Sequence, residues 1–139
     1  MIMLALYVVL YLNSPRTLQM RAPPAMFFGE DCLEEALKKV RGQRFLIVTD
    51  EPLVRLGYVD RLGDLLRKRG AHFEVFDSVE ADPSVATALN GVQRMRAFKP
   101  DAVIAFGGGS PIDCAKVMKL MYLHPDLSFE RARVVFMVG

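Results

Sequence analysis

Apolar residues along the chain fall into two alternating patterns, short apolar runs and longer stretches at helical spacing. The short runs are Phe45–Val48, Phe73–Phe76 and Ala102–Phe106. The first and third are continuous, which is typical of strands buried on both faces of a parallel sheet. Each run is followed by a stretch with apolar residues three or four positions apart, which predicts a strand and then a helix, three times over.

Four stretches are predicted to be helical, because residues that favour helix starts and ends mark their limits. Glycine at position 57 weakens the second of them, so we expect a break there. The predicted helices cover Glu30 to Val40, Leu53 to Arg69, Ser84 to Phe98 and Pro111 to Leu123. In the third, the apolar face comprises Val85, Ala88, Leu89, Val92, Met95 and Phe98. Strands separated by helices predict an α/β fold, a doubly wound and mainly parallel sheet with helices on both faces.

The two ends of the chain do not share this regularity. The uncharged apolar run from Met1 to Leu12 is too short for a membrane-spanning helix, which needs about 20 residues. It also lacks the basic segment that opens a signal peptide. We interpret residues 1–20 as an appendage unrelated to the chemistry, with a weak anchor and an extra strand as open alternatives. Residues 21–139 are then the α/β domain, in which Phe129 to Gly139 fits either helix or strand.

Composition places the chain among ordinary globular proteins, with 52% apolar and 24% charged residues. The net charge is +2, and the basic residues are scattered rather than interleaved with aromatic ones. This favours solvated helix surfaces over nucleic-acid binding. Cys32 and Cys114 lack the spacing of metal ligands, so we expect free thiols in a reducing compartment, the cytoplasm.

Three consecutive glycines, Gly107, Gly108 and Gly109, follow the third strand and precede Ser110. Residues without a Cβ let backbone N–H groups approach a phosphate closely, and the positive end of the following helix favours an anion. A tight turn that needs small residues for packing is the alternative, but three glycines exceed what a turn requires. The sequence therefore predicts a diphosphate-binding turn. The lysine of a Walker loop is missing, which disfavours phosphoryl transfer.

The start of the helix after this turn carries several polar residues. Ser110 is predicted to be its N-cap and Pro111 its first residue, with Asp113 where a capping-box acid stands. Asp113 could equally contact a ligand. For Lys116 a solvated stripe and a contact on the substrate side are both open, whereas Lys119 is expected at the surface.

Asp50 ends the first central strand, where a carboxylate can accept hydrogen bonds from both hydroxyls of an adenine ribose. A carboxylate there would repel a 2′-phosphate, which favours NAD over NADP. The alternative for Asp50 is a helix N-cap. In a standard dinucleotide fingerprint the acid follows the glycines, and here it precedes them.

Several segments together resemble the N-terminal domain of iron-containing (group III) alcohol dehydrogenases. The segments are residues 46–50 (LIVTD), 56–60 (LGYVD), 79–83 (VEADP), 98–101 (FKPD) and 107–116 (GGGSPIDCAK). Residues 121–126 (MYLHPD) resemble most the alcohol dehydrogenase half of bifunctional aldehyde–alcohol dehydrogenases. The resemblance covers roughly Arg21 to Met137, and its glycine motif is specific. It implies a Rossmann-like cofactor domain of the kind that dehydroquinate synthases share.

The resemblance implies a role for each matched position. Gly107 to Ser110 would bind the NAD diphosphate, Asp50 would select the adenosine ribose, and Asp113 and Lys116 would lie toward the nicotinamide. It also makes helix the expectation for Phe129 to Met137. The implied reaction interconverts a primary alcohol and an aldehyde by hydride transfer, assisted by a divalent metal, Fe²⁺ or Zn²⁺. A homo-oligomer is a further open expectation.

The sequence departs from the family at the metal. The helical second domain that supplies an aspartate and histidines is absent, and the two histidines here, His72 and His124, are expected at the surface or in capping positions. An alternative function is therefore an inactive fragment that binds nucleotide or assembles with longer relatives. A dehydroquinate synthase-like lyase is disfavoured by the VEADP segment and by the residues that follow the glycines.

Overall fold

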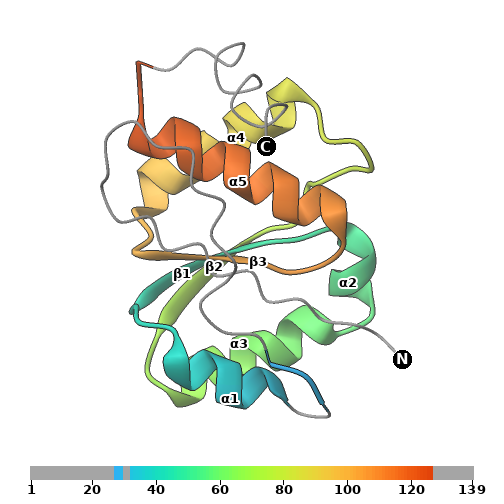
Figure 1. Cartoon of the computed structure of the whole chain (residues 1–139), viewed down its shortest axis with the longest axis vertical. Coiled ribbons are helices and arrows are strands. Elements are labelled where there is room, and N and C mark those ends of the chain that lie inside the picture. Colours follow the sequence, from blue (N-terminus) through green and yellow to red (C-terminus); the bar gives the residue numbers. More distant parts are fainter. Residues whose placement is uncertain (1–26, 30–31, 127–139) are drawn as a thin grey trace.

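The described part of the chain, residues 27–29 and 32–126 of a computed structural model, forms three strands and five helices (Figure 1). Their order is α1 (Cys32–Lys39), β1 (Arg44–Val48), α2 (Glu51–Arg55), α3 (Tyr58–Lys68), β2 (His72–Phe76), α4 (Val85–Phe98), β3 (Ala102–Ala105) and α5 (Gly109–Leu123). Each strand and helix predicted within these residues is present, and most of the described limits lie within two residues of those expected.

The strands form one parallel sheet in the order β2-β1-β3. In this register Val48 of the central strand lies level with Phe76 on one side and Ala105 on the other. The four apolar residues Phe45 to Val48 are fully buried. A central parallel strand has helices over both faces and cannot alternate with polar residues, which explains the unbroken apolar run.

Two layers of helix cover the sheet, α4 and α5 over one face and α1 and α3 over the other (Figure 1). Successive side chains of β1 divide between them. Leu46 and Val48 belong to the core under α4 and α5, whereas Phe45 and Ile47 belong to the core under α1 and α3. This arrangement confirms the predicted α/β fold with helices on both faces of a parallel sheet.

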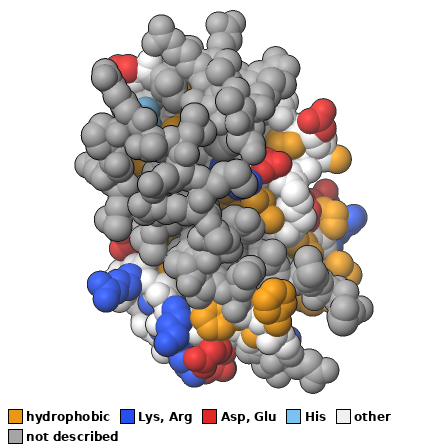
Figure 2. Space-filling view, in the orientation of Figure 1, with side chains coloured by type: hydrophobic (Ala, Val, Ile, Leu, Met, Phe, Trp, Pro, Cys, Tyr) orange, Lys and Arg blue, Asp and Glu red, His pale blue; other side chains and the backbone are white. Residues whose placement is uncertain are grey.

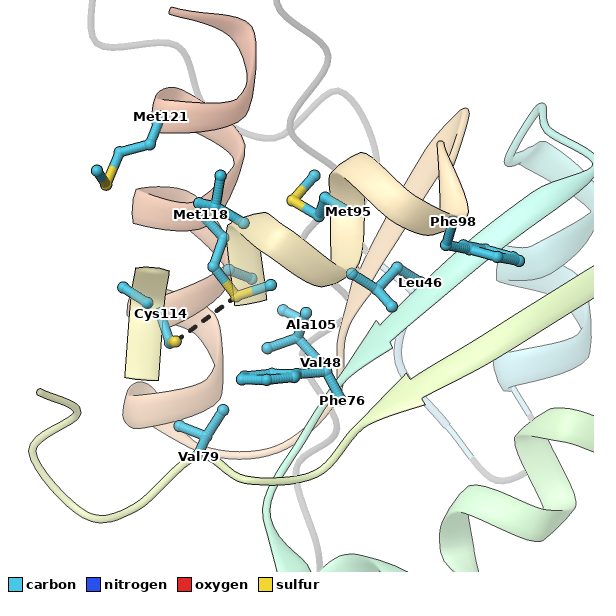
Figure 3. Close-up of a cluster of buried hydrophobic side chains, with 13 residues drawn as sticks. Leu46, Val48, Phe76, Val79, Met95, Phe98, Ala105, Cys114, Met118 and Met121 are labelled. Carbon is cyan, nitrogen blue, oxygen red and sulfur yellow. Dashed lines mark hydrogen bonds between the residues drawn. The ribbon is translucent and has the colours of Figure 1, made fainter. Parts of the chain in front are cut away.

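The core between the sheet and the α4–α5 pair is rich in sulfur. Figure 3 shows Val48 and Phe76 directed from the strands toward Cys114 and Met118 of α5. The Cys114 thiol lies 3.7 Å from the sulfur of Met118. A Cβ on Gly91 of α4 would overlap the same methionine side chain in its present conformation, so α4 approaches α5 closely where it carries no side chain.

The predicted apolar face of the third helix is wrong at two positions. Val85 and Leu89 are 40% and 42% exposed, whereas the glycine at position 91, which was not expected in the core, is buried. The direction of α4 is set by its contact with α5, and this contact requires a small residue where the apolar pattern shows none. Ala88, Val92, Met95 and Phe98 are buried as predicted.

The predicted break at Gly57 is confirmed. Gly57 has φ of +77° and separates α2 from α3, and Gly70, with φ of +73°, follows the end of α3. Both residues occupy the left-handed region that glycine adopts without strain. The expectations for residues 1–20 and for Phe129 to Met137 fall outside the described residues.

Charges of both signs are mixed on the described surface. Figure 2 shows basic and acidic side chains next to one another low on the visible face, over α1, where Lys38 pairs with Glu34 and Glu35. Exposed pairs of this kind contribute little stability. Within the described residues, no helix has the length and apolar character needed to cross a membrane.

Candidate functional site

The connections that leave β1, β2 and β3 lie at one edge of the sheet, on the right of Figure 1. From β1 the chain enters α2 and α3 on one face of the sheet, and from β3 it enters α5 on the other. The carboxyl ends of β1 and β3 therefore form a topological switch point, the place where open α/β sheets bind ligands. Asp50 and the three glycines follow these two strands, so the structure brings them to the same edge.

One hydrogen bond joins the loop after β1 to the loop after β3, and α2 lies close to the glycine turn. The hydroxyl of Thr49, a fully buried side chain, donates a hydrogen bond of 2.7 Å to the carbonyl oxygen of Phe106. A Cβ on Gly107 would lie 3.1 Å from Cδ1 of Leu53 in α2. The two loops thus form one packed unit, with the glycine turn on one side and Asp50 on the other.

Gly107 begins the turn with φ of +146°, and a Cβ there would lie 2.9 Å from Cγ of Pro111. Glycine is therefore required at this position by both backbone conformation and packing. Helix α5 begins directly after this residue, which is earlier than predicted. Its N-cap is Gly108 and its first residue is Gly109, so Ser110 lies inside the first turn and the predicted cap at Ser110 is wrong.

Gly108 and Gly109 differ from Gly107, because the described residues give no reason for glycine at either. Neither has positive φ, and a Cβ on either would meet nothing within 4 Å. The first N–H groups of a helix lack intrahelical acceptors, and here they belong to Gly108, Gly109 and Ser110. The turn therefore presents backbone donors beside open space that two side chains would fill, a geometry that fits an anionic group such as a diphosphate.

Asp50 is the N-cap of α2, with Oδ1 accepting a hydrogen bond of 3.1 Å from the Leu53 N–H. The helix-cap alternative is thus confirmed, although it uses only one carboxylate oxygen. The side chain is half-buried at the carboxyl edge of the sheet. Asp50 also pairs with Ser78, in the loop after β2, through an isolated antiparallel bridge. The loops after all three strands are therefore connected.

Asp113 and Lys116 lie farther along α5 and form an ion pair, with 2.9 Å between Nζ and Oδ1. Asp113 takes no part in capping the helix, because the helix starts at Gly109. Lys116 and Lys119, with Lys39 and Arg41, line a hollow of about 300 Å³ beside β3. Lys119 is half-buried, contrary to the predicted surface position, and burial lowers its pKa.

The loop from β2 to α4 is ordered by Glu80. Its carboxylate accepts hydrogen bonds from the Ser84 N–H at 2.9 Å and from the Thr87 hydroxyl at 2.7 and 2.8 Å. These hydrogen bonds lower the pKa of Glu80 to about 2, and the bond from the Ser84 N–H makes the largest contribution. Asp82 in the same loop has φ of +58°, a conformation uncommon outside glycine.

The histidines lie apart from this edge of the sheet. His72 is the exposed first residue of β2, and His124 is the C-cap of α5. Among residues 27–29 and 32–126, no group of three or more His, Cys, Asp or Glu side chains could hold a metal ion. The described residues therefore fit an anionic cofactor and do not provide a metal site.

Sequence reasoning missed Thr49 and Ser78. Among the described residues Thr49 is the one buried polar side chain, and it directly follows four buried apolar residues of β1. A hydroxyl at the end of a buried strand is the signal that could have identified it. No pattern in the sequence pointed to Ser78, because its position opposite Asp50 depends on how two loops cross.

The switch point, the glycine turn and the strand order define an α/β domain of the Rossmann-like class. The sequence model of the family described as iron-containing alcohol dehydrogenase matches residues 23–136. The chain therefore belongs to the iron-containing alcohol dehydrogenases, a family of oxidoreductases.

Individual relatives agree with this assignment. The chain is 42% identical over 120 residues to the bifunctional aldehyde-alcohol dehydrogenase of Escherichia coli, and 38% identical over 117 residues to an NADPH-dependent butanol dehydrogenase of Clostridium saccharobutylicum. These matches cover 84% of the chain but only 14% and 30% of the two relatives. The chain thus spans less than a third of either.

Solved structures show the same fold. An iron-containing alcohol dehydrogenase from Thermococcus thioreducens has a TM-score of 0.68 at 32% identity, over 73% of this chain and 27% of that one. One from Thermotoga maritima has a TM-score of 0.67 at 37% identity, over 75% and 30% of the two chains. Both similarities confirm the resemblance inferred from the sequence.

Proposed function

We propose that this chain is the NAD-binding part of an alcohol dehydrogenase that interconverts a primary alcohol and an aldehyde by hydride transfer with a divalent metal. The observation that carries the proposal is the open space over Gly108 and Gly109 at the start of α5. Bound NAD would supply the carbon that accepts the hydride. The N–H groups of Gly108, Gly109 and Ser110 would hold its diphosphate, and Gly107 would set the course of the turn.

The other candidate residues take roles along the same edge. Only one carboxylate oxygen of Asp50 takes part in the capping bond, and the carboxylate would accept hydrogen bonds from the hydroxyls of the adenosine ribose. Asp113 and Lys116 would lie toward the nicotinamide, where their mutual ion pair leaves little net charge. Relatives bear names that specify either NADPH or NADH. The preference for NAD in this chain is therefore argued from Asp50, whose negative charge opposes a 2′-phosphate.

The remaining components of the reaction would come from elsewhere. Residues outside those described would have to bind Fe²⁺ or Zn²⁺ and the small alcohol or aldehyde. A cytoplasmic location is supported by the two free thiols of Cys32 and Cys114. Assembly into a homo-oligomer remains a prediction from the sequence.

Calorimetry with NADH tests the proposal, with Gly108→Val as the key variant. Extended φ and ψ at Gly108 accept valine, and the new side chain would project into open space. We therefore expect the variant to keep the unfolding midpoint of the wild type and to lose NADH binding at least tenfold. Equal NADH binding by the two proteins would contradict a diphosphate site at this turn.

An assay of turnover separates the proposed enzyme part from the alternative of an inactive nucleotide-binding fragment. We expect this chain alone to bind NADH without oxidising ethanol or butanol in the presence of Fe²⁺ or Zn²⁺. Joining it to the remainder of a relative such as the Clostridium saccharobutylicum enzyme should restore turnover if it is a competent cofactor part. Binding without turnover in such a chimera would favour the inactive fragment.

A further inference from the structure

We propose that Ser78 and Asp50 together bind the adenosine ribose, with each side chain hydrogen-bonded to one of its two vicinal hydroxyls. This inference rests on the proposed function, and it assigns a specificity-determining role to a residue of the β2–α4 loop. The observation behind it is the isolated antiparallel bridge between Asp50 and Ser78.

The bridge places the two side chains on the same side of the paired backbones. Residues directly opposite one another in an antiparallel pair have Cβ atoms about 5 Å apart and project to one face. The hydrogen bond of 2.9 Å from the Thr49 N–H to the Phe76 carbonyl fixes the adjacent backbone. Ser78 therefore lies opposite Asp50.

Both side chains keep hydrogen-bonding capacity for a ligand. Asp50 uses Oδ1 for the Leu53 N–H, and its second oxygen takes no part in that bond. The Ser78 hydroxyl is exposed, and its bond to Oδ1 of Asp77 is 3.5 Å long, at the outer limit for a hydrogen bond. A carboxylate accepts from a hydroxyl, and a serine hydroxyl can donate or accept, so the pair suits a diol.

The surrounding charge favours a neutral diol over a phosphorylated ribose. Ser78 lies between Asp50, opposite it, and Asp77, which precedes it in the chain. By strand spacing, both carboxylates lie within about one Debye length (~10 Å) of anything that Ser78 binds. A 2′-phosphate would meet two negative charges there. The free hydroxyls of NAD would meet an acceptor and a hydroxyl.

The test compares NADH with two analogues that lack either the 2′- or the 3′-hydroxyl of the adenosine ribose. Dissociation constants are measured for the wild-type chain, for Ser78→Ala and for Ser84→Ala. Ser84→Ala is the matched control, because it removes from the same loop a hydroxyl whose bonds are to Thr87 at the start of α4. Thermal unfolding of each variant is followed in parallel, so that loss of fold is recognised separately.

We expect the wild type to bind each analogue about three- to tenfold more weakly than NADH, the effect of one hydrogen bond. Ser78→Ala should reduce the ratio of dissociation constants, analogue over NADH, to less than two for one analogue. Ser84→Ala should leave this ratio unchanged for both analogues. The role of Ser78 is overturned if Ser78→Ala discriminates against both analogues as the wild type does, or if the wild type binds both analogues as tightly as NADH. In either case, binding of NADH would still support the proposed function. Absence of NADH binding by the folded wild type would overturn both.

Discussion

The Thr49 hydroxyl lies 2.7 Å from the carbonyl oxygen of Phe106 and joins the loop after β1 to the loop after β3. This bond spans the switch point of the sheet, so it sets the distance between Asp50 and the glycine turn. A dinucleotide bound along this edge would contact both. Under the proposed function, Thr49 would position the site without contacting the cofactor.

Replacing Thr49 by valine tests this relationship. Valine has nearly the same shape but leaves the Phe106 carbonyl without its partner, so we expect the free energy of unfolding in urea to fall by about 1–3 kcal/mol. Thr49→Ser keeps the hydroxyl and should recover most of the loss caused by removing the hydrogen bond. A valine variant as stable as the wild type would show that the bond contributes nothing.

Gly107 and Gly108 are adjacent, yet alanine should affect them differently. At Gly107 a Cβ would combine a φ of +146° with a contact of 2.9 Å, so Gly107→Ala should cost about 1–3 kcal/mol of stability. Gly108→Ala should change stability by less than about 0.5 kcal/mol, because its Cβ meets nothing. Thermal unfolding of the pair measures the difference, and equal losses would contradict the assigned geometry of the turn.

Asp50→Ser separates the two roles of Asp50. Serine is also a good N-cap, so the stability of α2 should be kept within about 0.5 kcal/mol, but the negative charge is lost. The preference for NADH over NADPH should then fall by about tenfold, measured from dissociation constants at low salt. Asp50→Ala is the companion variant and should lose both the cap and the preference. An unchanged cofactor ratio in the serine variant would leave Asp50 with capping alone.

The two cysteines should differ in reactivity toward iodoacetamide at pH 8. Burial raises the pKa of the Cys114 thiol to about 11, with a smaller contribution from the charge of Glu80, whereas Cys32 is only half-buried. Mass spectrometry of the native chain should find Cys32 modified at least tenfold faster. Both should react alike in 8 M urea, and equally fast modification of native Cys114 would contradict its place in the core.

Glu80 should make stability depend on pH in the acid range. Its pKa is about 2 in the folded chain against 4.5 for the free side chain, so the carboxylate favours the folded state. This contribution is present well above pH 4.5 and is lost as the pH falls from 4.5 toward about 2. The stability difference between the wild type and Glu80→Gln should therefore shrink over this interval. A difference independent of pH would contradict the hydrogen bonds assigned to the carboxylate.

The sequence predicted the strands well because β1 is buried on both faces, which leaves an unbroken apolar run as its signature. The break at Gly57 was also predicted, because glycine has a low helix propensity. In the structure Gly57 has a positive φ, which ends the helix there. The start of α5 was predicted two residues late, because the serine at position 110 is a better intrinsic cap than glycine. In the structure Gly108 is the N-cap instead, directly after the positive φ of Gly107.

Tertiary contacts explain what the pattern of residues could not reveal. Leu89 has the helical spacing of a core residue, but the contact of α4 with α5 turns this side chain outward. Ser78 acquires its neighbour Asp50 only when two loops cross. A role that depends on contacts between residues distant in sequence produces no repeating pattern of residues, so a single sequence does not reveal it.

The contact between Gly91 and Met118 has a consequence for how these helices can change during evolution. A side chain at position 91 would occupy the volume that the methionine sulfur and methyl group now fill. In homologues with alanine or serine at position 91, the methionine at position 118 should therefore either turn its sulfur and methyl group away or be replaced by a shorter residue. The residues at these two positions should consequently covary.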